Sequence, residues 1–292
     1  SIIRELKNQN LNFVVAEKKY LNLLNQKNVE NWFKLNKPEI VIMAAAKVGG
    51  IFANKSYPVQ FLLDNLKMQT NIIENCFNFN VKKLLFLGSS CIYPKNSPQP
   101  IKEEYLLSSE LEETNEAYAI AKIAGLKLCQ AYKKQYNKNF ISLMPTNLYG
   151  PNDNFHPINS HVPAALFRKF HEAKINKNKF VEVWGSGKPM RDFLYVDDLA
   201  KACVFLLKND ISHDYLNIGS GSEISISSFS KLIKKVVGYS GEIIFDKTMP
   251  DGTMRKKLDI SIIKKLGWYP VFDLERGLQT TYKWIIKNRI FG

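Results

Sequence analysis

Tyr118 and Lys122 form a Tyr-x-x-x-Lys pair within residues 115–136, a stretch whose pattern predicts a helix. Positions four apart lie on one face of a helix. A lysine ammonium beside a phenol favours the phenolate, so we expect the pKa of Tyr118 to move down from about 10 toward the working pH. Such a phenol could donate a proton to a carbonyl oxygen while hydride arrives at the carbon. The pair alone is weak evidence, because Tyr-x-x-x-Lys is common on solvated helices.

Two serines strengthen this interpretation. Ser89 and Ser90 directly follow residues 83–88, an apolar run of strand length. A hydroxyl placed there could hydrogen-bond the same carbonyl oxygen that Tyr118 protonates. A serine, a tyrosine and a lysine in this order match the catalytic set of the short-chain dehydrogenases/reductases.

The elements that must position these residues alternate between strand and helix. This alternation predicts an α/β fold, a Rossmann-type doubly wound parallel sheet that binds ligands at the carboxyl ends of its strands. The expected strands are residues 11–16, 38–44, 83–88, 140–144 and 215–219. The expected helices are residues 1–7 (with Ser1 as a possible cap), 28–35, 58–79, 115–136 and a stretch ending near residue 209.

The pattern loosens beyond residue 150, which suggests two domains. We assign residues 1–151 and 192–220 to a dinucleotide-binding Rossmann domain. Residues 152–191 and 221–292 would form a smaller mixed α/β substrate-binding lobe.

Composition limits the function classes. The net charge of +14 comes from scattered or paired lysines, which favours a solvated basic surface over a nucleic-acid interface. The four cysteines form no C-x-x-C pair, so we expect neither a metal site nor a disulfide framework, and we expect a reducing, cytoplasmic setting. No run of about 18 apolar residues predicts a membrane helix, and no signal peptide is recognisable.

Six segments together resemble the GDP-L-fucose synthases, which are epimerase/reductases of the extended short-chain dehydrogenase/reductase family. They are AAAKVGG (44–50), KLLFLGSSCIYP (83–94), TNEAYAIAKIAG (114–125), MPTNLYGPNDNFHPINSH (144–161), VWGSGKPMRDFLYVDD (183–198) and PDGTMRKKLD (250–259). The resemblance covers essentially the whole chain. It implies the conversion of GDP-4-keto-6-deoxy-D-mannose to GDP-L-fucose with NADPH.

The resemblance also implies catalytic roles. Ser89, Tyr118 and Lys122 would serve reduction at C4, and Cys91 and His161 would serve epimerisation at C3 and C5. A ketone acidifies the protons on its neighbouring carbons, and inversion needs a base on one face and an acid on the other. Thiol and imidazole groups both titrate close enough to pH 7 for this work. Taken alone, Cys91 would more often be a small buried residue.

Candidate substrate contacts are less specific. Arg191 offers a fork of donors that suits a diphosphate. Trp184 could stack on the guanine or simply pack in the core, and Asn147 could bind the sugar or belong to a turn. The full candidate set is Ser90, Asn147, Lys169, Trp184, Arg191 and Lys265, the last of which could equally be a surface lysine.

The expected cofactor is NADP(H). Lys18 follows the expected strand at residues 11–16, which would be the second strand of a complete Rossmann domain. A cation at this place can pair with an adenosine 2′-phosphate, although Glu17 beside it weakens the preference for NADP over NAD. The candidate cofactor contacts are Lys18, Ala44, Ala45, Ala46, Lys122, Asn147, Leu148 and His161.

A glycine-rich turn after the first strand normally receives the cofactor pyrophosphate. The first glycine of this sequence is Gly49, so no such turn precedes it. We therefore expect that the sequence opens inside the first helix and that the natural protein begins about 15–20 residues earlier.

Three alternatives stay open. The chain could act on another nucleotide sugar, as a GDP-colitose-type synthase or a related epimerase does. It could be a non-catalytic fragment that only binds a nucleotide sugar, or a basic nucleic-acid-binding protein on charge alone. The family resemblance also implies a homodimer formed through helices at 58–79 and 115–136.

Overall fold

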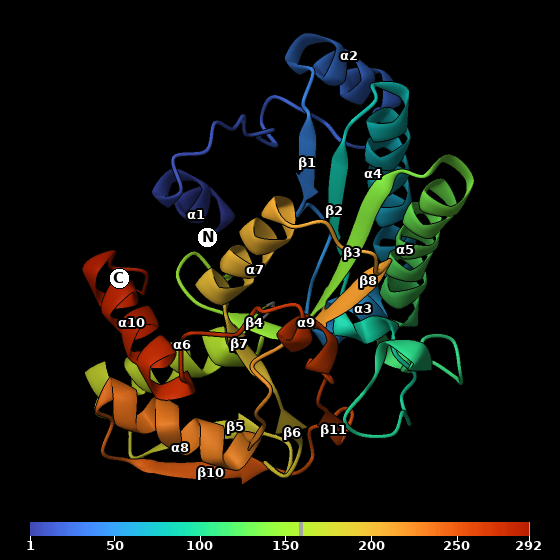
Figure 1. Ribbon diagram of the computed structural model, residues 1–292. Coiled ribbons are helices and arrows are strands. Elements are labelled where there is room, and N and C mark those ends of the chain that lie inside the picture. The colour runs from blue at the N-terminus through green and yellow to red at the C-terminus, as the bar shows by residue number, and fades with distance from the viewer. Residues whose placement is uncertain (158–159, 292) are drawn as a thin grey trace.

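The computed structural model describes residues 1–157 and 160–291, and a parallel sheet forms its centre (Figure 1). The strand order is β1-β2-β3-β8, with every neighbouring pair parallel. The strands are β1 (Ile40–Met43), β2 (Lys83–Leu87), β3 (Asn139–Pro145) and β8 (Tyr215–Ile218). The expected α/β fold is confirmed, and the chain's parallel strands end at one common edge.

Helices cover both faces of this sheet (Figure 1). One face carries α4 (Pro58–Asn78) and α5 (Glu116–Tyr136), with α2 (Gln26–Asn36) packed on α4. The other face carries α7 (Val196–Lys208), against which α1 (Ile2–Asn8) packs. Ser1 stands at the N-cap of α1, but its side chain makes no capping hydrogen bond.

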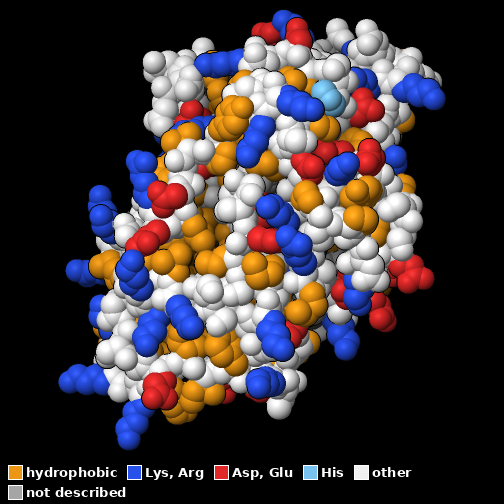
Figure 2. All heavy atoms as spheres, turned by 60° about the horizontal axis from the view of Figure 1, so that its bottom comes forward, with side chains coloured by type: hydrophobic (Ala, Val, Ile, Leu, Met, Phe, Trp, Pro, Cys, Tyr) orange, Lys and Arg blue, Asp and Glu red, His pale blue; other side chains and the backbone are white. Residues whose placement is uncertain are grey.

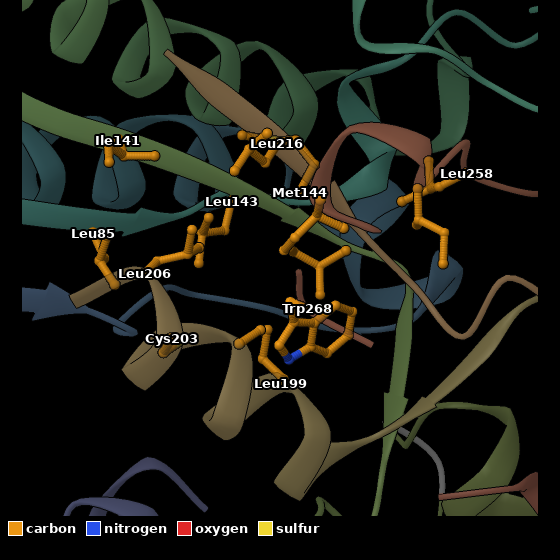
Figure 3. Close-up of a cluster of buried hydrophobic side chains, with 14 of the residues drawn as sticks. Leu85, Ile141, Leu143, Met144, Leu199, Cys203, Leu206, Leu216, Leu258 and Trp268 are labelled. Atoms are coloured by element: carbon orange, nitrogen blue, oxygen red, sulfur yellow. The ribbon is translucent and has the colours of Figure 1, made fainter. Parts of the chain in front are cut away.

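The side chains of β2 point alternately to the two faces of the sheet, which explains why helices cover both faces. Leu84 and Phe86 pack in the cluster under α4 and α5, whereas Leu85 packs toward α7. Successive strand residues point to opposite faces, so a continuous apolar run is what a doubly covered strand requires. Figure 3 shows the α7 side, where Leu85 lies in one cluster with Leu199 and Trp268.

That cluster modifies the expected domain boundary. Leu258, Ile260, Ile263 and Trp268 are buried in it, and α9 (Ser261–Lys265) packs on β8. Residues 258–268 therefore belong to the sheet core, although the sequence placed 221–292 in the lobe.

A second apolar cluster forms the smaller lobe. Its elements are α6 (Val162–Ile175), β5 (Phe180–Trp184), α8 (Ile226–Val237), β10 (Glu242–Asp246) and α10 (Leu274–Lys287). Short strands join the lobe to the sheet domain: β4 (Asn147–Tyr149) pairs with β7 (Phe193–Tyr195), and β6 (Met190–Arg191) pairs with β9 (Ile224–Ser225) and β11 (Arg255–Lys256).

The expected strand at residues 11–16 is wrong: the segment is irregular, with Val14 and Val15 exposed. A strand needs a hydrogen-bonded neighbour, and among the described residues none pairs with this segment. For the same reason β1 is an edge strand whose Ile40 is exposed, rather than the buried strand that its apolar run predicted.

The surface agrees with a solvated basic protein. Figure 2 shows lysines and arginines scattered over the face it presents, with carboxylates between them. In the described part of the chain, no helix is both long and apolar enough to cross a bilayer. The same residues contain no cluster of side chains arranged to hold a metal ion.

Candidate active site

The residues that follow the carboxyl ends of β1, β2 and β3 converge at one edge of the sheet. Ala44 to Gly50 follow β1, Ser89 and Cys91 follow β2, and Asn147 follows β3. The parallel registers of these strands place their ends side by side. This is the edge at which doubly wound sheets bind ligands.

Close packing of α5 against β2 brings Tyr118 and Lys122 to this edge. A Cβ on Gly125 would lie 2.5 Å from the Phe86 ring, so only glycine lets the helix approach this closely. Gln69 of α4 fixes the helix further by donating to the Ala121 carbonyl at 2.6 Å. Lys122 Nζ then donates to the carbonyl of Leu87, the last residue of β2, at 2.8 Å.

Burial, more than charge, controls the titration of this pair. Burial raises the pKa of Tyr118, the negative charge that Cys91 can carry adds to the rise, and a hydrogen bond with Ser89 opposes it. Burial lowers the pKa of Lys122 to about 8. The expected lowering of the Tyr118 pKa is thus wrong, because Lys122 lies 5.9 Å above the ring centre and bonds to Leu87 instead. A neutral Tyr118 is the form that donates a proton.

Cys91 is half-buried in a single 3₁₀ turn, Ser90–Ile92, beside this pair. Its backbone N–H donates to Ser89 Oγ at 3.2 Å, which fixes the turn. Lys256 Nζ of β11 lies 3.9 Å from Cys91 Sγ. Lys256 was not among the predicted site residues, although it lies within the segment 250–259, because 165 residues separate it from Cys91 in the sequence.

Arg191 stands next to Lys256, because β6 and β11 pair with Lys256 opposite Arg191. Burial lowers the Arg191 pKa, while the nearby Asp251 and Cys91 act in the opposite direction. Asn147 lies close by and donates to the Asp192 carbonyl at 3.1 Å. A cationic patch therefore borders the thiol on the lobe side.

Trp184 and Lys169 extend this border onto the lobe. Lys169 Nζ lies 5.0 Å over the Trp184 ring and donates to the Glu182 carbonyl at 3.0 Å. Trp184 is 53% exposed, which excludes the alternative of core packing. Its free ring face could stack on a flat base.

His161 is the exposed N-cap residue of α6. It lies near Asp153. Burial raises the pKa of the Asp153 carboxyl, and the nearby His161 opposes this rise. The neighbouring Ser160 carbonyl lies 3.8 Å from the Cβ position of Gly50, so this segment borders the loop after β1. No contact joins His161 to Cys91 among the residues that the structure describes.

The structure does not bring every candidate to the site. Ser90 is 4% exposed, so it has little surface to offer a substrate. Leu148 packs against the sheet core. Lys18 and Lys265 are exposed, and in the described residues no side-chain contact ties either of them to the other candidates.

The residues present fit the nicotinamide half of NADP(H). Lys122 is 2% exposed, yet Leu87 O is the one hydrogen-bond acceptor found for its three donors among the described residues. Its remaining donors suit the ribose hydroxyls of a cofactor. Ala44, Ala45 and Ala46 present small side chains after β1, which lets a planar ring approach the backbone closely.

Comparisons with known proteins agree with this geometry. The NAD dependent epimerase/dehydratase family model matches residues 1–219. GDP-L-fucose synthase 1 of Arabidopsis thaliana is 55% identical over 289 residues, which cover 99% of this chain and 90% of that protein.

Two solved structures have the same fold. A Naegleria fowleri GDP-L-fucose synthetase bound to NADP superposes with a TM-score of 0.91 at 29% identity, covering 100% of this chain and 91% of that one. A Campylobacter jejuni GDP-6-OMe-4-keto-L-xylo-heptose reductase superposes with a TM-score of 0.93 at 36% identity, covering 98% of this chain and 94% of that one. The chain belongs to the NAD dependent epimerase/dehydratase family and, within it, groups with the GDP-L-fucose synthases.

Proposed function

We propose that this protein converts GDP-4-keto-6-deoxy-D-mannose to GDP-L-fucose with NADPH, by epimerisation at C3 and C5 and reduction at C4. The observation that carries the proposal is the convergence of two chemistries at one edge of the sheet. Tyr118 can protonate a ketone oxygen to which Ser89 donates a hydrogen bond, and Cys91 stands beside them as a base. Reduction alone would need no thiol there.

Epimerisation begins at a carbon next to the substrate ketone. The Cys91 thiolate removes the proton from that carbon, and the electron pair of the broken C–H bond moves onto the ketone oxygen. Ser89 and Tyr118 stabilise this oxygen by hydrogen bonds. Return of a proton to the opposite face, for which His161 is the candidate acid, inverts the centre without any change in oxidation state.

Reduction follows at the ketone carbon. NADPH, when bound, supplies hydride to this carbon. Tyr118 donates its phenolic proton to the oxygen, and its raised pKa keeps that proton in place until charge develops there. Lys122 holds the cofactor ribose and carries positive charge at pH 7, which favours the phenolate that forms.

The lobe side recognises the nucleotide. The Arg191 guanidinium suits the diphosphate and the Trp184 ring suits the guanine, while Lys169 and Asn147 are further candidate contacts. These assignments stay proposals, as do those of Lys18, Leu148 and Ala44 to Ala46 for the cofactor.

The test is to incubate the purified protein with GDP-4-keto-6-deoxy-D-mannose and NADPH while following the absorbance at 340 nm and identifying the product. Loss of NADPH with formation of GDP-L-fucose supports the proposal. A Cys91→Ser variant should keep reductase activity and yield sugars that are not fully epimerised. Cofactor binding without NADPH oxidation in the presence of this sugar would refute it.

A second candidate is reduction of a related GDP-sugar without double epimerisation, favoured by the fold shared with a GDP-heptose reductase. The half-buried Cys91 beside Lys256 argues for the epimerising enzyme. Running the reaction in D₂O distinguishes reduction alone from epimerisation with reduction, because only epimerisation places deuterium on the carbons next to the ketone.

We also propose that two copies associate through α4 and α5, in keeping with the homodimer that the family resemblance implies. Val59 and Leu63 on α4 and Ile120 on α5 are exposed apolar residues, which a second copy could cover. A Leu63→Glu variant should elute as a monomer in size-exclusion chromatography if the proposal holds, whereas a monomeric wild type would contradict it.

The free state of Cys76, Cys91, Cys129 and Cys203 supports the expected cytoplasmic location, which stays a proposal.

A further inference from the structure

Lys256 places a positive charge against the sulfur of Cys91. Its Nζ lies 3.9 Å from Cys91 Sγ, within the range of a hydrogen bond to sulfur. The two residues come from opposite parts of the site, since Cys91 follows β2 of the sheet domain and Lys256 ends β11 at the junction with the lobe.

The backbone around Lys256 is held firmly. Lys257 donates from its N–H to Gln99 Oε1 at 2.9 Å, and its carbonyl accepts from Ile101 N at 2.7 Å. On the other side, Arg255 forms a two-pronged ion pair with Glu223. Because both neighbours of Lys256 are fixed, its backbone has a defined position, and its half-buried side chain extends from there to the Cys91 sulfur.

The groups that face the thiol come from three elements. Tyr118 of α5 stands on the sheet side as a neutral phenol, and Arg191 of β6 and Lys256 of β11 stand on the lobe side as cations. A thiolate beside lysine and arginine is favoured over a thiol, and the thiolate is the form that removes a proton. Of the two cations, only Lys256 has an atom within hydrogen-bond range of the sulfur in the described residues.

We propose that Lys256 is a positioning residue for epimerisation, whose ammonium holds the Cys91 sulfur as a thiolate at the site of proton removal. This inference rests on the proposed function for its catalytic consequence. In the step itself, the C–H bond next to the ketone breaks, an S–H bond forms and the electron pair moves to the ketone oxygen. The ammonium keeps its proton throughout.

The test needs neither substrate nor cofactor. Iodoacetamide alkylation of Cys91 is measured against pH in the wild type and in Lys256→Met, Lys256→Arg and Lys231→Met variants. The other three cysteines are buried, and Cys91→Ser gives the background. Lys231 is an exposed lysine on α8 and serves as the matched control.

We expect Lys256→Met to slow alkylation at pH 7.5 by about tenfold and to move the midpoint of its pH profile up by about one unit. Lys256→Arg should stay within about threefold of the wild type because it keeps the charge. A folded Lys256→Met variant with the wild-type profile would overturn the proposal. So would a Lys256→Arg variant as slow as Lys256→Met, because charge would then not be the cause.

A second readout separates positioning from substrate binding. Deuterium exchange from D₂O into the carbons next to the substrate ketone should fall about tenfold in Lys256→Met at saturating substrate, with KM changed less than about threefold. A raised KM with unchanged exchange at saturation would make Lys256 a substrate contact and overturn the proposal. If the wild type neither exchanges deuterium nor oxidises NADPH, the proposed function fails, while the alkylation profile still reports on Lys256 and Cys91.

Discussion

The two sides of the active site are built in different ways. The sheet wall, defined as Ser89, Tyr118 and Lys122, comes from a strand end and the helix packed on it, and it is largely buried. The lobe wall, defined as Trp184, Arg191 and Lys256, comes from three short strands, and its side chains range from half-buried to exposed. Cys91 lies between the two walls.

This difference separates chemistry from recognition. Buried donors exert their full electrostatic effect on a reacting oxygen because little water screens them. The exposed Trp184 ring and the half-buried Arg191 can adapt to a bulky nucleotide and release the product. Substitutions in the sheet wall should therefore act on kcat or on stability, whereas substitutions of Trp184 and Arg191 in the lobe wall should act on KM. Lys256 is the exception, because its ammonium acts through Cys91.

The largest effect is expected for Tyr118→Phe. Loss of the phenolic proton donor should lower kcat by about 10³-fold, or about 4 kcal/mol of activation free energy, with little change in KM for either substrate. Steady-state NADPH oxidation measures both constants. A Tyr105→Phe variant, which alters a tyrosine outside the sheet wall, is the control. A fall in kcat of less than tenfold would mean that another group protonates the ketone.

Lys122→Met should show that the buried charge of Lys122, which the cofactor needs, lowers the stability of the folded protein. The folded pKa of about 8 lies below the ordinary value of 10.5, so the unfolded chain binds this proton more tightly than the folded one. The stability of the wild type should thus rise as pH increases from about 8 to 10.5. Below pH 8 the wild type should carry the full free-energy cost of burying the Lys122 charge. At pH 7 the variant should be more stable by up to about 3 kcal/mol while losing cofactor affinity.

Urea unfolding at pH 7 and pH 9.5 measures the difference in unfolding free energy between the variant and the wild type. This difference should be smaller at the higher pH. Lys127→Met, on an exposed position of the same helix, should show no pH-dependent difference. A difference that stays constant between the two pH values would contradict the assigned cause.

Gly125→Val tests how the sheet wall is positioned. The new side chain would collide with Phe86 and Gln69, so α5 should shift and the protein should lose about 2 kcal/mol of stability. Ala124→Val places the same side chain at an exposed neighbouring position and should change stability by less than about 0.5 kcal/mol. Equal unfolding midpoints for the two variants would show that the close approach of α5 is not required.

The same contrast between walls explains what could be predicted from the sequence. The sheet wall was predictable because each residue sits on or beside a long periodic element: a buried strand precedes Ser89, and one helix carries Tyr118 and Lys122. Long apolar patterns are the most reliable signals in a sequence. The direction of the Tyr118 pKa was wrong, since the carbonyl that Lys122 bonds is known only from the packing of α5.

The lobe wall was less predictable. Strands of two residues, such as β6 and β11, have no periodicity, and the pairing of Arg191 with Lys256 joins segments more than 60 residues apart. The strand expected at residues 11–16 failed for a related reason, because strand formation depends on a partner as well as on local pattern. Residues 258–268 joined the sheet core through tertiary packing that local patterns do not reveal.

Trp184→Ala should give the smallest effect and the clearest contrast with Tyr118→Phe. Removing an exposed ring that stacks on a base should raise KM for the GDP-sugar by about tenfold, or about 1.4 kcal/mol, and leave kcat within about twofold. Phe180→Ala is the matched control, because Phe180 is equally exposed on the same face of β5 at its far end. A lower kcat with unchanged KM would mean that Trp184 shapes the reacting geometry, and the division of labour between the two walls would then fail.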